Sequence, residues 1–114
     1  MNQAFAVITG ASQGLGKAFA EVLARQHKNL VLISLPNEGL PELCAQFENQ
    51  FSIRAEYYET DLGIKENVTD LAAWINANFK IDILINNAGI GGTKCFDDVS
   101  TAYIENIISI NVSA

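Results

Sequence analysis

Residues 9–16 read Thr-Gly-Ala-Ser-Gln-Gly-Leu-Gly, and they stand between the apolar run 4–8 and an amphipathic stretch. A strand, a glycine-rich turn and a helix in this order can bind a phosphate group, because the start of the helix offers unpaired backbone N–H groups and the positive end of the helix dipole. Each glycine is expected to have its own role: Gly10 permits the tight turn, Gly14 lets a diphosphate approach the backbone, and Gly16 lets the helix pack on the strand. The stretch therefore predicts a phosphate-binding turn at the end of a strand.

The composition predicts one globular domain. The chain has 114 residues, of which 49% are hydrophobic and 18% charged, and its net charge is −6. With only 7 Lys and Arg residues, a nucleic-acid or membrane partner is not expected. No apolar run approaches the roughly 20 residues of a membrane span, and no signal peptide precedes the first predicted strand. Cys44 and Cys95 lack a Cys-x-x-Cys spacing, so reduced thiols in a cytoplasmic protein are expected.

Short apolar runs alternate with segments of helical periodicity, a pattern typical of βαβ units. Strands are expected at residues 4–9, 30–34, 53–59 and 81–85, the third of them as an edge strand. Helical stripes cover residues 14–26, 40–51 and 68–79, and a further helix is expected to start near Thr101. The apolar face of the first helix is assigned to Leu15, Ala18, Phe19, Val22 and Leu23.

Right-handed crossovers predict how these strands are arranged. The first two connections step the same way across the sheet, and the third returns to place the fourth strand beside the first. The result is a doubly wound parallel α/β sheet of order 3-2-1-4. Ligands bind such sheets over the carboxyl ends of the strands, at the point where the order reverses. That point lies between the first and fourth strands, where residues 9–16 and 86–89 both fall.

The spacing Thr-Gly-x-x-x-Gly-x-Gly, together with Asn86-Asn87-Ala88-Gly89, resembles the short-chain dehydrogenase/reductase family. The resemblance implies a Rossmann-type domain, of which residues 1–114 are the N-terminal portion, truncated before its remaining strands. It also implies an NAD(P)-dependent oxidoreductase that transfers a hydride between nicotinamide and a carbonyl or alcohol substrate. The implied cofactor-binding residues are Gly10, Ser12, Gln13, Gly14, Leu15, Gly16, Ser34, Asp61, Leu62, Asn87, Ala88 and Gly89.

Two positions carry specific roles by this resemblance. Asp61 would accept a hydrogen bond from the adenine amino group, with Leu62 beside it, although Asp61 could equally be the N-cap of the third helix. Asn111 matches the active-site asparagine of the family, at an interrupted helix whose backbone carbonyl holds a water in the proton relay. The alternative for Asn111 is an exposed asparagine within a helix.

The choice of cofactor depends on the end of the second strand. An acidic residue there would bind the ribose hydroxyls of NAD and repel a 2′-phosphate. The chain has Ser34-Leu35-Pro36-Asn37, and the other position at which the family places a basic residue is Gln13. Hydroxyl and amide donors at Ser12, Ser34 and Asn37, with Lys17 nearby, favour NADP over NAD.

A proton donor is missing from these residues. The family uses a tyrosine followed four residues later by a lysine, and none of the 3 tyrosines has a lysine at that spacing. We therefore expect the chain to be an inactive fragment of a longer enzyme, homo-oligomeric at full length, in which residues 81–85 pair with a further strand. A non-catalytic dinucleotide-binding or regulatory module is the alternative, and Asn111 argues for the enzyme.

Overall fold

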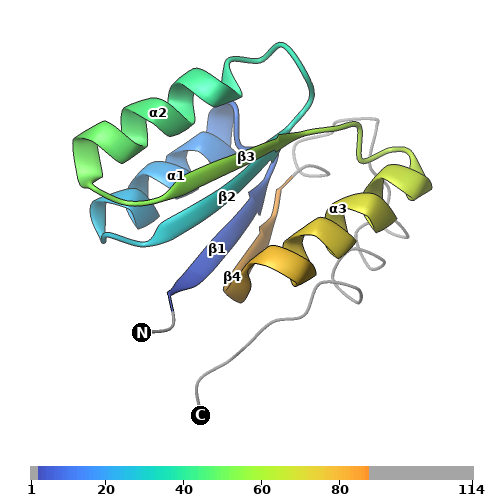
Figure 1. Cartoon of the computed structure of the whole chain (residues 1–114). Coiled ribbons are helices and arrows are strands. Elements are labelled where there is room, and N and C mark those ends of the chain that lie inside the picture. Colours follow the sequence, from blue (N-terminus) through green and yellow to red (C-terminus); the bar gives the residue numbers. More distant parts are fainter. Residues whose placement is uncertain (1–2, 88–114) are drawn as a thin grey trace.

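The computed structural model describes residues 3–87. Its elements are β1 (Ala4–Thr9), α1 (Gly14–Arg25), β2 (Asn29–Ser34), α2 (Leu40–Phe51), β3 (Ala55–Glu59), α3 (Lys65–Asn78) and β4 (Lys80–Asn86). The four strands are parallel and lie in the order β3-β2-β1-β4 (Figure 1). The sheet order predicted from right-handed crossovers is thus confirmed. The helix expected near Thr101 lies outside the described residues.

Helices cover both faces of this sheet. Figure 1 shows α1 and α2 on one side and α3 on the other. Because neighbouring side chains of a strand point to opposite faces, β1 contributes Ala6 and Ile8 to the core under α1 and α2, and Phe5 and Val7 to the core under α3. Residues 30–34 of β2 are all buried, as expected of a strand covered on both faces.

The buried face of α1 differs from the one assigned from the sequence. Its fully buried residues are Gly16, Ala20 and Ala24, spaced four apart, and this stripe of small side chains faces the sheet. The assigned apolar residues are mainly exposed: Leu15 is 53% exposed, Val22 52% and Phe19 36%. Large apolar side chains dominate the helical pattern, but small residues let the helix backbone approach the sheet closely. The apolar face predicted for α1 was therefore wrong except at Leu23, which packs against the core at its margin.

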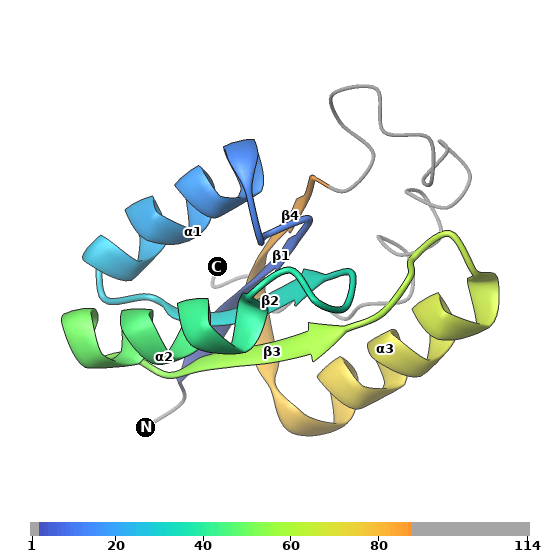
Figure 2. The same ribbon diagram turned by 90° about the horizontal axis from the view of Figure 1, so that it is seen from above.

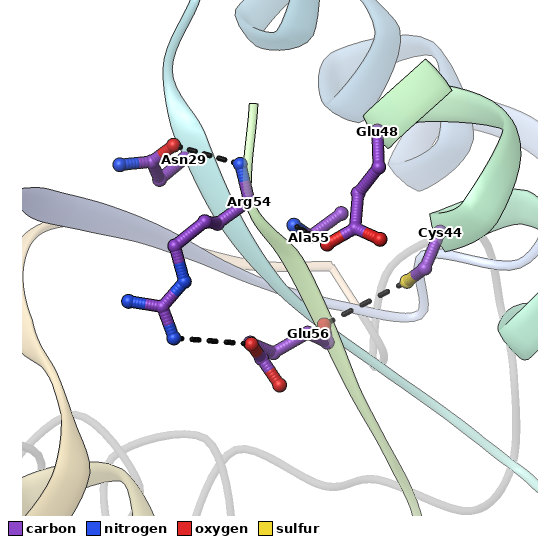
Figure 3. Close-up of polar contacts among 6 residues, drawn as sticks. All are labelled: Asn29, Cys44, Glu48, Arg54, Ala55 and Glu56. Atoms are coloured by element: carbon purple, nitrogen blue, oxygen red, sulfur yellow. Dashed lines mark hydrogen bonds and ion pairs between the residues drawn. The ribbon is translucent and has the colours of Figure 1, made fainter. Parts of the chain in front are cut away.

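The two edge strands of the described sheet, β3 and β4, differ in their contacts with other elements. At β3 the Ala55 N–H donates to the Glu48 carboxylate of α2 at 3.0 Å, and the Cys44 thiol lies 3.7 Å from the Glu56 carbonyl oxygen (Figure 3). The contact with Glu48 occupies the outward-facing Ala55 N–H, with which another chain could otherwise pair. β3 is an edge strand, as predicted. β4 forms the opposite edge within residues 3–87, and its pairing with a further strand stays a prediction.

Cys44 is expected to resist alkylation while the protein is folded. Burial, followed by the nearby carboxylates of Glu48 and Glu56, raises the pKa of its thiol from 9.0 to about 12. Since the thiolate is the reactive form, iodoacetamide at pH 8 should leave Cys44 unmodified in native protein and label it in urea. Peptide mass mapping measures the two states site by site, and rapid native labelling of Cys44 would contradict its burial.

No helix within residues 3–87 is long and apolar enough to cross a membrane.

Candidate functional site

The candidate site lies where β1 and β4 end side by side. Thr9, the last residue of β1, pairs in register with Asn86, the last residue of β4. Both strands run in the same direction, so their carboxyl ends meet at the same edge of the sheet. Figure 2 shows that β4 ends beside the turn that leads from β1 into α1. This is the reversal point of the strand order, as the sequence predicted.

A hydrogen-bond network joins the two strand ends. The Thr9 hydroxyl donates to the Asn86 side-chain oxygen at 2.8 Å and accepts the Asn87 backbone N–H at 2.9 Å. The Asn87 side-chain amide donates to the Gly10 carbonyl oxygen at 3.3 Å. Thr9 is 0% exposed, so its hydroxyl depends on these partners in place of water. The paired asparagines thus fix the position of the glycine-rich turn relative to β4.

The turn itself requires glycine at two kinds of position. Gly10 has φ 63° and Gly14 has φ 60°, in the left-handed region that side chains disfavour. A Cβ built on Gly16 would lie 2.1 Å from the Gly10 carbonyl oxygen and 2.7 Å from the Asn87 side-chain nitrogen. Gly16 therefore allows close approach, as predicted, but the nearest atoms belong to the turn and to Asn87. Among residues 3–87, no atom lies within 4 Å of a Cβ built on Gly14.

The first turn of α1 offers backbone donors to a ligand. Its N-cap, Gln13, is extended at φ −158° and makes no side-chain cap hydrogen bond, and the first turn holds no acidic residue. The first N–H groups of a helix have no partner within the helix. Together with the dipole, they favour an anion above residues 14–16. Leu15 belongs to this turn, and its side chain is exposed.

Two predicted phosphate donors, Ser34 and Ser12, already donate hydrogen bonds within the protein. Ser34 is 5% exposed, and its hydroxyl donates to the Leu35 carbonyl oxygen at 2.9 Å. The Ser12 hydroxyl, in the glycine-rich turn, donates to the Glu38 carboxylate at 2.5 Å. Glu38 was not predicted as a site residue. An acidic residue about 20 residues after a glycine-rich motif has the spacing typical of a ribose ligand, and this spacing is the signal in the sequence that could have identified it.

Asp61 and Leu62 follow β3, close to the same edge. The Asp61 carboxylate accepts the Gly63 N–H at 2.8 Å, while the N-cap of α3 is Ile64. The alternative that Asp61 caps this helix was therefore wrong, because the carboxylate forms a local turn before the helix begins. Leu62 is 6% exposed and packs in the core under α3. Any contact of Leu62 with a ligand would use its backbone.

A sequence model described as short chain dehydrogenase matches residues 4–114. The chain belongs to the short-chain dehydrogenase family. Two motifs carry the family resemblance within the described residues: the glycine-rich turn and the Asn-Asn segment. In the structure, hydrogen bonds join them into one unit.

Similar proteins include reductases of carbonyl compounds. Very-long-chain 3-oxoacyl-CoA reductase from Anas platyrhynchos is 32% identical over 113 residues, which cover 96% of this chain and 36% of that protein. The protein of the same name from Kluyveromyces lactis is 36% identical over 115 residues, which cover 97% of this chain and 33% of that protein. The chain thus spans about one third of the length of these relatives.

Solved structures of the family share the fold. A short-chain dehydrogenase from Sphingobium yanoikuyae, in complex with NADPH, aligns with a TM-score of 0.82 at 24% identity, covering 92% of this chain and 47% of the other. L-sorbose reductase from Gluconobacter frateurii, complexed with NADPH and L-sorbose, aligns with a TM-score of 0.71 at 32% identity, covering 82% and 36%. The Rossmann-type fold predicted from the sequence is confirmed.

Three predicted site residues lie outside the described part of the chain. They are Ala88 and Gly89, which complete the Asn-Asn-Ala-Gly segment, and Asn111, which the family resemblance places in the proton relay. Their roles stay predictions. The remaining residues cluster at the carboxyl ends of β1, β2, β3 and β4, which is the edge a dinucleotide would cross.

Proposed function

We propose that the protein containing this chain is an NADP(H)-dependent oxidoreductase of the short-chain dehydrogenase type. The observation that carries the proposal is the Thr9–Asn86–Asn87 network, which holds the glycine-rich turn and the end of β4 together at the reversal of the strand order. The bound cofactor supplies the hydride, and this chain binds and orients it.

Each end of the cofactor has a proposed place. The diphosphate lies over residues 14–16, where the N–H groups of the first turn of α1 face it. The adenine lies near Asp61, and the nicotinamide ribose lies near Ala88 and Gly89. Gly10 and Gly16 shape the turn, while Gln13 and Leu15 contribute backbone donors at its exit.

We propose NADP(H) over NAD(H) because the residue directly after β2 is not acidic and because hydrogen-bond donors stand nearby. Ser12 and Asn37 are polar donors near the adenosine ribose, and Lys17 of α1 adds a positive charge nearby. Ser34, buried and bonded to a backbone carbonyl, contributes less than the sequence suggested. The L-sorbose reductase that resembles this chain is complexed with NADPH.

The reaction proposed is hydride transfer between the nicotinamide and a carbonyl or alcohol. The named relatives are reductases of 3-oxoacyl-CoA and of L-sorbose, which supports this substrate class. Asn111 is the proposed relay residue of this chain. These relatives are longer than this chain, and we expect the proton donor in the part of the parent protein that corresponds to their additional length. A cytoplasmic location is proposed because Cys44 is a free thiol, and a homo-oligomeric parent stays a prediction.

Replacing Gly14 with leucine tests the diphosphate position. The side chain would occupy the open space through which the diphosphate reaches the N–H groups of α1. We expect affinity for NADP+ to fall at least about tenfold, or ~1.4 kcal/mol, measured by calorimetric titration of the protein that carries this chain.

Gly39→Leu is the matched control. Gly39 also has a positive φ, 79°, and also precedes a helix, and no atom of the described part of the chain lies within 4 Å of a Cβ built on it. Both variants therefore carry similar backbone strain. Gly39 lies in the loop beside the proposed adenosine ribose, and only Gly14 lies at the proposed diphosphate site. Equal losses of affinity in the two variants would show that strain, and not blocked binding, explains the result.

A further inference from the structure

β4 contains one residue more than its pairing with β1 requires. The two strands run side by side (Figure 1), and Phe5 of β1 pairs with Ile81 of β4. The next residue of β1, Ala6, pairs with Ile83, so Asp82 is left over between two successive pairs. Such a β-bulge shifts every later residue of its strand by one position along the partner strand.

The bulge determines which residue of β4 reaches the candidate site. Because of the shift, Asn86 stands opposite Thr9. In a pairing without the bulge, Ile85 would take that place and Asn86 would move past the end of β1. The hydrogen bond between Thr9 and Asn86, and the one from Asn87 to the Gly10 carbonyl, therefore depend on the bulged register.

The apolar residues of β4 do not select this register by themselves. Ile83 and Ile85 pack against the core under α1 and α2, and Leu84 packs against the core under α3. A slip by one residue would send each side chain to the opposite face of the sheet, where it would meet another apolar core. A strand that suits both faces in this way needs a polar residue to fix its register.

Asp82 is that polar residue. Without the bulge it would stand opposite Ala6, which is fully buried under α1 and α2, and its carboxylate would lose its hydration there. In the bulge it is 32% exposed, and the Lys28 ammonium donates to its Oδ2 at 2.5 Å. Lys28 directly precedes β2, whose first residue pairs with Phe5, so the ion pair holds Asp82 toward the amino end of the sheet.

The carboxylate depends on this cation. The other oxygen of Asp82, Oδ1, is buried and accepts no hydrogen bond from residues 3–87, and the Lys28 side chain is only 21% exposed. Removing one member of such a pair leaves an uncompensated charge, whereas replacing both members with apolar side chains is often neutral for stability. A variant that lacks both charges can therefore test the register without unfolding the protein.

We propose that Lys28 and Asp82 are positioning residues for the cofactor site, because their ion pair holds the bulge that brings Asn86 and Asn87 to the glycine-rich turn. Both lie near the amino ends of the strands, and the site lies at the carboxyl ends, so they act through the register of β4. The effect on cofactor binding rests on the proposed function. The effect on the register does not.

Two variants that both lack the ion pair test the inference in the protein that carries this chain. In Lys28→Met/Asp82→Leu, position 82 is apolar and the pairing without a bulge becomes favourable. In Lys28→Met with Asp82 deleted, no extra residue remains, so regular pairing itself puts Asn86 opposite Thr9. By calorimetric titration, we expect the affinity for NADP+ to fall at least about tenfold in the leucine variant and to stay within about threefold in the deletion variant.

Hydrogen exchange of the Asn87 amide, followed by mass spectrometry without cofactor, reports the register directly. This amide donates to the Thr9 hydroxyl at 2.9 Å. Its protection should fall at least about tenfold in the leucine variant and stay unchanged in the deletion variant. Protection of Val31, fully buried in β2, should persist in both variants, which a general loss of stability would not allow.

Asp82→Asn is the conservative variant. Asparagine is also polar, so the bulge should persist and the affinity for NADP+ should stay within about threefold; this variant replaces the deletion as the comparison if the deletion does not fold. If the leucine variant keeps its Asn87 protection, the ion pair does not set the register and the inference fails. Equal losses in the leucine variant and its comparison would show that the ion pair itself is required, which also overturns the inference. If the unmodified protein binds neither NADP+ nor NAD+, the proposed function fails, and the exchange of Asn87 still decides whether Asp82 sets the register.

Discussion

Gly16→Ala should destabilise the protein by about 2 kcal/mol and abolish measurable cofactor binding, although alanine is the better helix former. A methyl group at this position would lie 2.1 Å from the Gly10 carbonyl oxygen and 2.8 Å from its carbon, both backbone atoms. The turn would have to move away from α1 and break the contact with Asn87. Urea denaturation measures the free energy of unfolding, and calorimetric titration measures the binding.

The opposite substitution, alanine to glycine, on the exposed face of α1 gives the helix-propensity scale against which the Gly16→Ala result is judged. Ala18→Gly should cost about 1 kcal/mol from helix propensity alone, because Ala18 is exposed. By the same scale, an unobstructed Gly16→Ala would stabilise the protein by about 1 kcal/mol. A gain in stability on Gly16→Ala would show that the helix and the turn are not in close contact.

Thr9→Val should lower the free energy of unfolding by about 3 kcal/mol. Valine keeps the shape of the side chain and removes the hydroxyl, which leaves the Asn87 N–H and the Asn86 side-chain oxygen without this partner in a closed site. Cofactor affinity should fall as well, because the end of β4 is no longer tied to the turn. Chemical denaturation and titration with NADP+ measure the two effects.

Thr9→Ser separates the hydroxyl from the methyl group. Serine keeps the donor and acceptor, so stability should fall by only about 1 kcal/mol, the value of a buried methyl group. Cofactor affinity should stay within about threefold of the unmodified protein. If valine and serine had equal effects on stability, packing of the methyl group, and not the hydrogen-bond network, would explain the role of Thr9.

The order of the strands could be predicted from the sequence because strong local signals agreed with one another. Apolar runs such as residues 30–34 mark strands buried on both faces, and right-handed crossovers then leave one arrangement. The glycine-rich turn and the Asn86-Asn87 pair fall at the strand ends that the topology brings together. The need for glycine at positions 10 and 16 could therefore be predicted, because the motif requires a tight turn at one and close backbone approach at the other.

What the sequence did not predict depends on distances between elements. α1 carries large apolar residues on one face and small ones on another, and only the closeness of the turn selects the stripe Gly16, Ala20 and Ala24 for the sheet. The Ser12–Glu38 contact likewise depends on the left-handed conformation of Asn37 and Gly39, which places a residue of one loop against another. Pattern alone does not determine either distance.

The Thr9–Asn86–Asn87 network also determines how the site opens. The Gly10 carbonyl accepts from the Asn87 side chain, and the Asn87 backbone donates to Thr9, so we expect the turn and the end of β4 to open as one unit. Local fluctuations of folded proteins commonly occur in such cooperative units. We therefore expect the proposed diphosphate half and the proposed nicotinamide half of the site to share one opening equilibrium, so that a cofactor bound at either half also protects the other.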